Sequence, residues 1–381
     1  IPQSAPYLSW FTDSSYPWNS ADASPLFVIA HADHWRATGD RDSCDAAYQL
    51  LRGLTYLQTA TGPHAGNVVL WMQPDGALNP SADPPERPDP SDSGPASWLA
   101  RTIWALGEGF AAFRGTDAAF AGFLADRLRL ALAAVRRQCL VDDGRWLTVD
   151  GEPTPAWLIA DGADATGEAL LGLSAYASAS GDGRVLPAVT RLAAGVAAMR
   201  TGDAHTSPFG ALLPWARSRS VWHAWGGLAA AGLARAHQVI TSSGGGSRSP
   251  ETGGCPTAAA VAEAALADTA SFTPYLLVTT GPDNSWLPAS TDRSQVAYGA
   301  QSRMESLLEV AGCLHRPALT ALAGIAASWF FGNNPAGEPM YDPTTGRTFD
   351  GIDVPGLVHR DSGAASTIHG LLAMLALDAD P

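Results

Sequence analysis

Acidic, aromatic and basic side chains gather in the segments that precede the predicted helices of this chain. Indole and phenol faces stack on the C–H faces of sugar rings, while Asp and Arg side chains bond sugar hydroxyls. The residues of these segments that could bind a sugar are Trp18, Asp22, Asp92, Trp98, Asp164, Trp222, His223, Trp225, Tyr298, His359 and Arg360. Their convergence at one rim would predict a carbohydrate substrate.

Carboxyl groups suited to catalysis occur in the same segments. Cleavage of a glycosidic bond uses two carboxyl groups, about 5–5.5 Å apart for retention of configuration and roughly 6.5–9.5 Å apart for inversion. Asp350 and Asp161 are the candidate catalytic acids. The rim holds more acids than the reaction needs, so the sequence alone does not select the pair.

Each candidate also has a plainer interpretation. Asp22, Asp92 and Asp164 are suited to cap the start of a helix, and a single Trp is more often a core side chain than a sugar platform. Asp350 lies in a Phe-Asp-Gly sequence, where Asp is a common turn residue. Only their joint position at one rim favours the functional interpretation.

Helical periodicity recurs along nearly the whole chain, whereas alternating strand patterns are short and isolated. The pattern predicts an all-α fold with helices near residues 22–38, 43–60, 97–113, 117–138, 164–179, 184–200, 222–240, 257–271, 296–313, 317–331 and 363–378. Three helices end at a Gly that an Asp closely follows, at Gly39–Asp40, Gly115–Asp117 and Gly181–Asp182. Gly favours a left-handed C-terminal turn and Asp caps the next helix, so these turns join antiparallel pairs.

Long segments join the successive pairs, over residues 61–96, 139–163, 201–221, 272–295 and 332–362. Short turns at one end and long loops at the other predict an (α/α)6 toroid, formed as a single domain over residues 1–381, with its site at the mouth where the inner helices begin. An (α/α)6 toroid has twelve helices and the pattern predicts eleven, so one helix is irregular or is not detected by periodicity. The Gly- and Ser-rich segment 241–256 is expected to be a flexible surface loop.

Composition excludes several function classes. The formal charge of −14, with no clustered cations, argues against nucleic acid and against an anionic membrane surface as partners. The chain contains arginine but no lysine, so it has neither a Schiff-base lysine nor a P-loop lysine. The partner expected is a carbohydrate substrate, and the protein is expected to be a monomer.

No apolar run approaches the length of a membrane span, and the chain begins at Ile1 without a signal segment. A secreted or cell-associated protein with its leader already removed is favoured. Cys44, Cys139, Cys255 and Cys313 show no zinc-binding spacing, so neither a metal nor another cofactor is expected. The predicted topology makes a disulfide between Cys255 and Cys313 geometrically possible.

Two N-terminal regions carry a family resemblance. Residues 19–27 together with 37–40 look like the start of the first barrel helix in debranching-type glucosidases. Residues 96–98 through 104–107 resemble the third-helix signature of a little-characterised group of bacterial toroid domains that occur beside carbohydrate enzymes. The resemblance therefore implies an (α/α)6 toroid glycosidase-like protein.

The C-terminal part is the most distinctive. Its Trp-Phe-Phe-Gly-Asn-Asn-Pro run over 329–335 and the His-Arg segment before residue 361 are similar in layout to family 9 glycoside hydrolases. The little-characterised group usually reads Gly-Ala-Glu-Ser-Thr at the next positions, and this chain has Ala365 in place of the Glu. Either the natural chain lacks this acid, or a catalytic Glu was replaced. The intact surrounding motif favours replacement, with Asp350 as the partner acid.

These observations predict a glycoside hydrolase that uses paired carboxyl groups, or its form inactivated by replacement of Glu at position 365. One alternative is a catalytically silent glycan-binding toroid. Another is a polysaccharide lyase, with Tyr298 or His223 as proton carrier and Arg360 neutralising a uronate. A terpene-cyclase-like toroid ranks last, because the chain has neither a DxDD nor a DDxxD motif.

Overall fold

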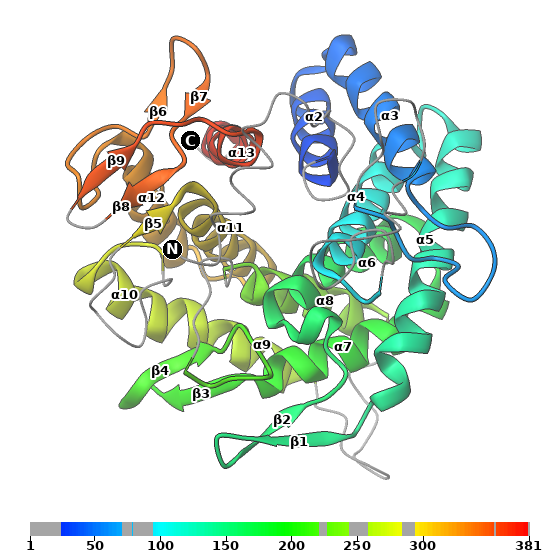
Figure 1. Ribbon diagram of the computed structural model, residues 1–381, viewed down its shortest axis with the longest axis horizontal. Helices are drawn as coiled ribbons and strands as arrows, with labels where there is room; N and C mark the ends of the chain where they lie inside the picture. The colour runs from blue at the N-terminus through cyan, green and yellow to red at the C-terminus, as the bar shows by residue number, and fades with distance from the viewer. Residues whose placement is uncertain are drawn as a thin grey trace.

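The computed structural model describes residues 24–70, 78, 94–220, 227–243, 258–283, 294–353 and 356–379. Within them, inner helices stand in a closed ring, in which each helix touches the next and the last touches the first (Figure 1). The inner helices are α2 (Ser24–Thr38), α4 (Ser97–Phe113), α6 (Ala163–Ser180), α8 (Ala229–Ser242), α11 (Ala297–Cys313) and α13 (Ala364–Ala379). The outer helices lie between successive inner ones and are α3 (Arg41–Tyr56), α5 (Ala118–Gln138), α7 (Leu186–Ala198), the continuous pair α9 (Ala258–Ala267) and α10 (Thr273–Thr279), and α12 (Ala318–Ala327). This alternation of inner and outer helices confirms the predicted (α/α)6 toroid.

Every predicted helix has a counterpart within the described residues, and the largest extension concerns the outer helix expected over 257–271. Here α9 continues through a π-helical turn, Asp268–Phe272, into α10, which ends at Thr279. The Asp268 carboxylate accepts hydrogen bonds from Arg303 Nη1 at 2.6 Å and from the Leu212 N–H at 3.1 Å. These partners come from distant parts of the chain, so local periodicity could not reveal them.

Small residues let the inner helices approach one another closely. A Cβ atom on Gly107 of α4 would lie 1.9 Å from the carbonyl oxygen of Gly172 on α6. A Cβ atom on Gly232 of α8 would lie 2.5 Å from the carbonyl oxygen of Gly167 on α6. Any side chain at these positions would force the helices apart, so the glycines set the width of the ring.

The short turns follow the predicted chemistry, with one exception. Asp40, Asp117 and Asp182 each accept a hydrogen bond from a backbone N–H at the start of the next helical segment. Gly39 and Gly181 are left-handed as expected, with φ of +75° and +68°. Gly115 is not left-handed, because α4 closes with a hydrogen bond from the Arg114 N–H to Phe110.

Short antiparallel strands occupy the long loops, at the end of the ring where the inner helices begin. The two-stranded pairs are β1 (Trp146–Val149) with β2 (Glu152–Pro155), β3 (Arg200–Asp203) with β4 (Thr206–Leu212), and β6 (Tyr341–Asp342) with β7 (Arg347–Thr348). A three-stranded sheet has the order β5 (Gln295–Val296), β8 (Gly351–Asp353), β9 (Leu357–His359). This sheet links the start of α11 to the segment that leads into α13.

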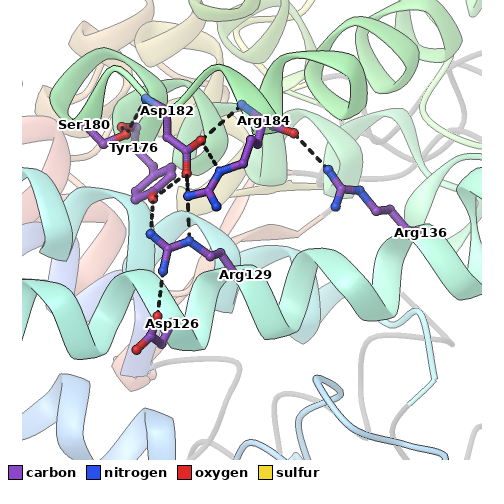
Figure 2. A network of polar contacts seen from close by, with 7 residues as sticks. All are labelled: Asp126, Arg129, Arg136, Tyr176, Ser180, Asp182 and Arg184. Atoms are coloured by element: carbon purple, nitrogen blue, oxygen red, sulfur yellow. Dashed lines mark hydrogen bonds and ion pairs between the residues drawn. The ribbon is translucent and has the colours of Figure 1, made fainter.

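A polar network at the short-turn end ties α5 to the turn between α6 and α7 (Figure 2). Asp182 accepts hydrogen bonds from Arg184 Nε and Nη2 at 2.7 Å and from the Tyr176 hydroxyl at 3.1 Å. Arg129 of α5 donates to the same hydroxyl at 3.0 Å and pairs with Asp126 at 2.6 Å. The hydrogen bonds from Arg184 hold the pKa of Asp182 well below its usual range. The network fixes the end of the barrel opposite the long loops.

The cysteines do not support the suggested disulfide. Cys44, Cys139 and Cys313 are free thiols, and Cys255 lies outside the described residues. The Cys313 sulfur lies 3.6 Å from Glu309 Oε2, in polar surroundings rather than beside another sulfur.

None of the helices in the described ranges is both long and apolar enough to cross a bilayer.

Candidate functional site

Buried polar side chains from different inner helices meet inside the ring. Arg101 of α4 places its Nε atom 3.2 Å from both carboxylate oxygens of Glu168 on α6. The Tyr298 hydroxyl, from α11, donates to Glu168 Oε1 at 3.1 Å. All three residues are more than nine-tenths buried. A buried carboxylate needs such partners to remain ionised, so Arg101 and Tyr298 keep Glu168 as an anion.

His369 of α13 extends this group across the ring. Its imidazole lies edge-on to the Tyr298 ring, with centroids 4.5 Å apart, and its Nδ1 atom lies 3.1 Å from Gln301 Oε1. We call Arg101, Glu168, Tyr298, Gln301 and His369 the lumen cluster. Burial, assisted by the Arg101 charge, holds the pKa of His369 well below its usual value, so its imidazole is neutral. Burial and the Glu168 charge raise the pKa of Tyr298, so its phenol keeps its proton.

Asp164 lies above the lumen cluster, one helical turn before Glu168 on the same face of α6. Burial raises the pKa of Asp164 to about 7, and the Glu168 charge acts in the same direction. A hydrogen bond from the Ala165 N–H at 2.8 Å and the charge of Arg101 act in the opposite direction. Asp164 is only half-buried, so solvent reaches it from the long-loop end. A carboxyl group with this pKa can both give and take a proton near neutral pH.

Asp161 lies at the rim rather than in the lumen. Ala160 and Asp161 both have φ of +53°, a left-handed conformation that residues with a Cβ atom rarely adopt. This turn directs the Asp161 carboxylate to Arg217, whose Nε atom lies 2.9 Å away. Asp161 is therefore held in a partly exposed ion pair, and its catalytic role stays a prediction.

Asp350 joins the β5–β8–β9 sheet to α13. Its Oδ1 atom accepts hydrogen bonds from the Gly363 N–H at 2.8 Å and from the Ser366 hydroxyl at 2.6 Å. Its Oδ2 atom has no hydrogen-bond partner among the described residues and lies 4.0 Å from His359 Nδ1. One oxygen of this buried carboxylate thus caps α13, and the other points toward His359.

Position 365 faces the lumen. Ala365 is the second residue of α13, is half-buried, and precedes His369 by four residues, which places the two on one helix face.

Arg360, which the lyase alternative needs as a free cation, instead forms an ion pair with Glu338 and lies over the Phe349 ring at 5.3 Å.

Trp98 is a core side chain in this fold. It is 5% exposed, and its indole N–H donates to the Val68 carbonyl oxygen at 2.9 Å. This burial leaves little of the ring for a sugar, which favours the plainer of its two interpretations. Six further sugar-binding candidates lie outside the described residues, namely Trp18, Asp22, Asp92, Trp222, His223 and Trp225.

Sequence reasoning missed Arg101, Glu168 and His369. The predicted site residues came from the segments that precede the helices, whereas these three residues lie one turn or more inside them. A usable signal was present, because Arg101 lies between the apolar residues of a mostly apolar helix and Glu168 follows Asp164 at the i, i+4 spacing. A charged residue on the buried face of a helix requires a partner from another helix.

A second charged group lies deeper in the ring, nearer the short turns. We call it the lower cluster, and it comprises Asp33, Arg36, Glu108, Arg235, Glu305 and Glu309. Arg36 of α2 pairs with Glu108 of α4 at 3.2 Å, and Arg235 of α8 pairs with Glu309 of α11. Burial and the charge of Glu309 raise the pKa of Glu305 to about 8. Among the residues that the structure describes, no His, Cys, Asp and Glu side chains form a group of three or more able to hold a metal ion.

Comparison with known proteins shows shared architecture. A sugar epimerase from a ruminal bacterium superposes with a TM-score of 0.61 at 12% identity, over 95% of this chain and 88% of that one. A polysaccharide lyase superposes with a TM-score of 0.61 at 10% identity, over 99% of both chains. A GH76 α-mannanase from Bacteroides thetaiotaomicron superposes with a TM-score of 0.53 at 10% identity, over 93% and 85%. No family model and no curated protein matches the chain. The likeness establishes the toroid fold.

Proposed function

We propose that this toroid is a glycan-processing enzyme, and that it cleaves glycosidic bonds with Asp164 as the proton-transferring residue. The proposal rests on the Asp164–Glu168 pair, two carboxyl groups one helical turn apart. Their surroundings favour the ionised form of Glu168 and the protonated form of Asp164. Arg101 and Tyr298 hold Glu168 as an anion, whereas burial favours the protonated form of Asp164. Pairs of this kind divide acid and anion roles in glycosidases.

In the proposed reaction, Asp164 gives its proton to the glycosidic oxygen as the bond to the anomeric carbon breaks. Positive charge then develops on the sugar ring, and the Glu168 anion stabilises it. Asp164, now ionised, takes a proton from the water that attacks the anomeric carbon, which restores the starting state. Arg101 and Tyr298 position Glu168 and do not themselves transfer a proton in this scheme.

Two features weigh against a lyase that uses Tyr298 and Arg360. The raised pKa of Tyr298 suits a proton donor and not the base that must remove a proton from the substrate. Arg360 already forms an ion pair with Glu338. Support for carbohydrate chemistry in general comes from the toroid neighbours, which are named as epimerases, an isomerase, hydrolases and a lyase.

A second candidate is the predicted glycan-binding toroid whose acid is missing at position 365. The placement of Ala365 on the His369 face of α13 favours it, because a Glu there would reach the lumen. The Ala365→Glu variant separates the two. Turnover in the unmodified chain supports Asp164 as the acid, whereas turnover only in Ala365→Glu supports position 365 with Asp350.

The test is product analysis on a panel of polysaccharides and oligosaccharides. Hydrolysis yields new reducing ends, epimerisation yields a new isomer with no new ends, and a lyase yields an unsaturated product that absorbs ultraviolet light. We expect new reducing ends from the unmodified chain and none from Asp164→Asn. Reducing ends formed equally by both proteins would refute the assignment of Asp164.

A further inference from the structure

An exposed aromatic side chain lies beside the start of α6. Trp215 is 37% exposed and pairs through its backbone with Gly162, two residues before Asp164. Its neighbours add two hydrogen bonds, from the Ala163 N–H to the Pro214 carbonyl oxygen at 2.9 Å and from the Ala216 N–H to the Asp161 carbonyl oxygen at 2.8 Å. These contacts fix the backbone of Trp215 against the segment that leads into α6, two residues before the proposed acid, and leave its side chain partly exposed.

The charges around this position are unusual for a site that binds acidic sugars. The arginines that touch the mouth residues are already paired: Arg101 with Glu168, Arg217 with Asp161, and Arg360 with Glu338. The next cation along the chain, Arg219, donates from its guanidinium to Thr201 on β3. Asp164 and Asp350 form no ion pair or hydrogen bond with an arginine among the described residues. The mouth described here therefore carries surplus acid and no uncommitted guanidinium next to Asp164.

Building on the proposed function, we propose that Trp215 and the Asp161–Arg217 ion pair form a sugar subsite beside Asp164, and that this subsite selects uncharged glycans over uronate-containing ones. The indole supplies a flat apolar face for the C–H side of a pyranose or furanose ring. The ion pair offers donors from Arg217 and acceptors from Asp161 to the sugar hydroxyls at the edge of that ring. A uronate carboxylate would lie near the Asp161 and Asp164 carboxyl groups, and the described residues supply no unpaired guanidinium there to compensate its charge.

The first test compares two exposed tryptophans. Trp215→Ala removes the proposed platform, and Trp146→Ala is the matched control, because Trp146 is 50% exposed on β1 and packs edge-on against Trp157. Binding of neutral gluco-, manno- and arabino-oligosaccharides is measured by calorimetry in proteins that also carry Asp164→Asn, which blocks turnover. We expect about tenfold weaker binding for Trp215→Ala and no change for Trp146→Ala. Equal affinity in both variants, or no binding of any oligosaccharide before substitution, would overturn the subsite.

The second test changes charge and keeps the side-chain shape. Asp161→Asn releases Arg217 from its carboxylate partner. We expect this variant to bind an oligogalacturonate of matched length roughly tenfold more tightly than the unmodified chain does. Neutral sugars should bind to the variant slightly less tightly than to the unmodified chain. Arg217→Gln is the control, since it removes the cation and should give no gain. An oligogalacturonate that the unmodified chain binds more tightly than neutral sugars would refute the selectivity.

Failure of this inference is distinguishable from failure of the proposed function. If Asp164→Asn abolishes turnover while Trp215→Ala leaves oligosaccharide binding unchanged, the acid assignment stands and the subsite is wrong. If Trp215→Ala weakens binding while Asp164→Asn leaves turnover intact, the subsite stands and the acid lies elsewhere.

Discussion

The lumen cluster and the lower cluster occupy the same ring of helices and both pair arginine with glutamate, yet they are organised differently. Arg101 and Glu108 are seven residues apart on α4, as are Tyr298 and Glu305 on α11, so the clusters lie about 10 Å apart along the barrel. In the lower cluster, two arginines join neighbouring helices through ion pairs. In the lumen cluster, Arg101 pairs with Glu168 of the neighbouring helix, and Asp164 above them forms no ion pair with an arginine among the described residues.

This difference indicates that the lower cluster serves the stability of the ring and the upper group serves catalysis. Ion pairs between adjacent inner helices hold the ring closed, and the variants that break them should unfold the protein more easily. A carboxyl group that faces the long loops with a pKa near neutrality costs stability and is suited to proton transfer. We therefore assign the proposed reaction to the upper group and the closure of the ring to the lower one.

The largest expected effect comes from Glu168→Gln. Loss of the anion removes stabilisation of the positive charge on the sugar ring, so kcat/KM should fall by about 10²–10³-fold. The pKa of Asp164 should also fall, because the neighbouring negative charge is gone, and the alkaline limit of activity should move to lower pH. Steady-state kinetics across pH on the best substrate checks both. A variant with unchanged kcat/KM would remove Glu168 from the proposed reaction.

Arg235→Met tests the lower cluster. It leaves the largely buried Glu309 without its cation next to Glu305, and we expect a loss of about 2–3 kcal/mol in the free energy of unfolding, less than for a fully buried pair because Arg235 is partly exposed. Urea unfolding measures the loss. The activity of the folded fraction should stay within twofold, and a large fall in kcat with no loss of stability would contradict the division between the clusters.

The pH dependence of stability sharpens the comparison further. The pKa of Glu305 in the folded protein is raised to about 8, above its unfolded value, so the folded state holds the extra proton and the protein loses stability as pH rises from about 4.5 to 8. Asp164 contributes in the same direction up to about pH 7. Urea unfolding at several pH values should show a shallower decline for Glu305→Gln and for Asp164→Asn, but only the second should lose activity. No change of slope in Glu305→Gln would show that Glu305 does not titrate in this range.

The sequence predicted the fold well because the fold depends on local patterns. The Gly39–Asp40 and Gly181–Asp182 turns and the apolar faces of the helices fixed the alternation of inner and outer elements. The site was harder to predict, since its partners meet only after the ring closes. Arg101 and Glu168 lie 67 residues apart, and Tyr298 lies 130 residues beyond Glu168.

Position in sequence was also a poor guide to what each rim residue does. Asp164 was recognised as a rim residue, but its pKa depends on burial and on Glu168, which only the structure shows. Asp350 was singled out as a catalytic acid, and one of its oxygens caps α13 through Gly363 and Ser366. Trp98 was expected at the rim and packs into the core, whereas Trp215, which was not selected, is exposed beside Asp164.

The most direct test of the central claim is the pH profile of kcat/KM for the unmodified chain and for Asp164→Asn. If Asp164 donates the proton, activity must fall as pH rises through about 7, where Asp164 becomes ionised. We expect this alkaline limb in the unmodified chain and at least about a 10²-fold loss in Asp164→Asn, with no comparable limb in the residual rate. An unmodified profile that stays flat through pH 7, or an Asp164→Asn variant that keeps the same limb, would contradict this claim.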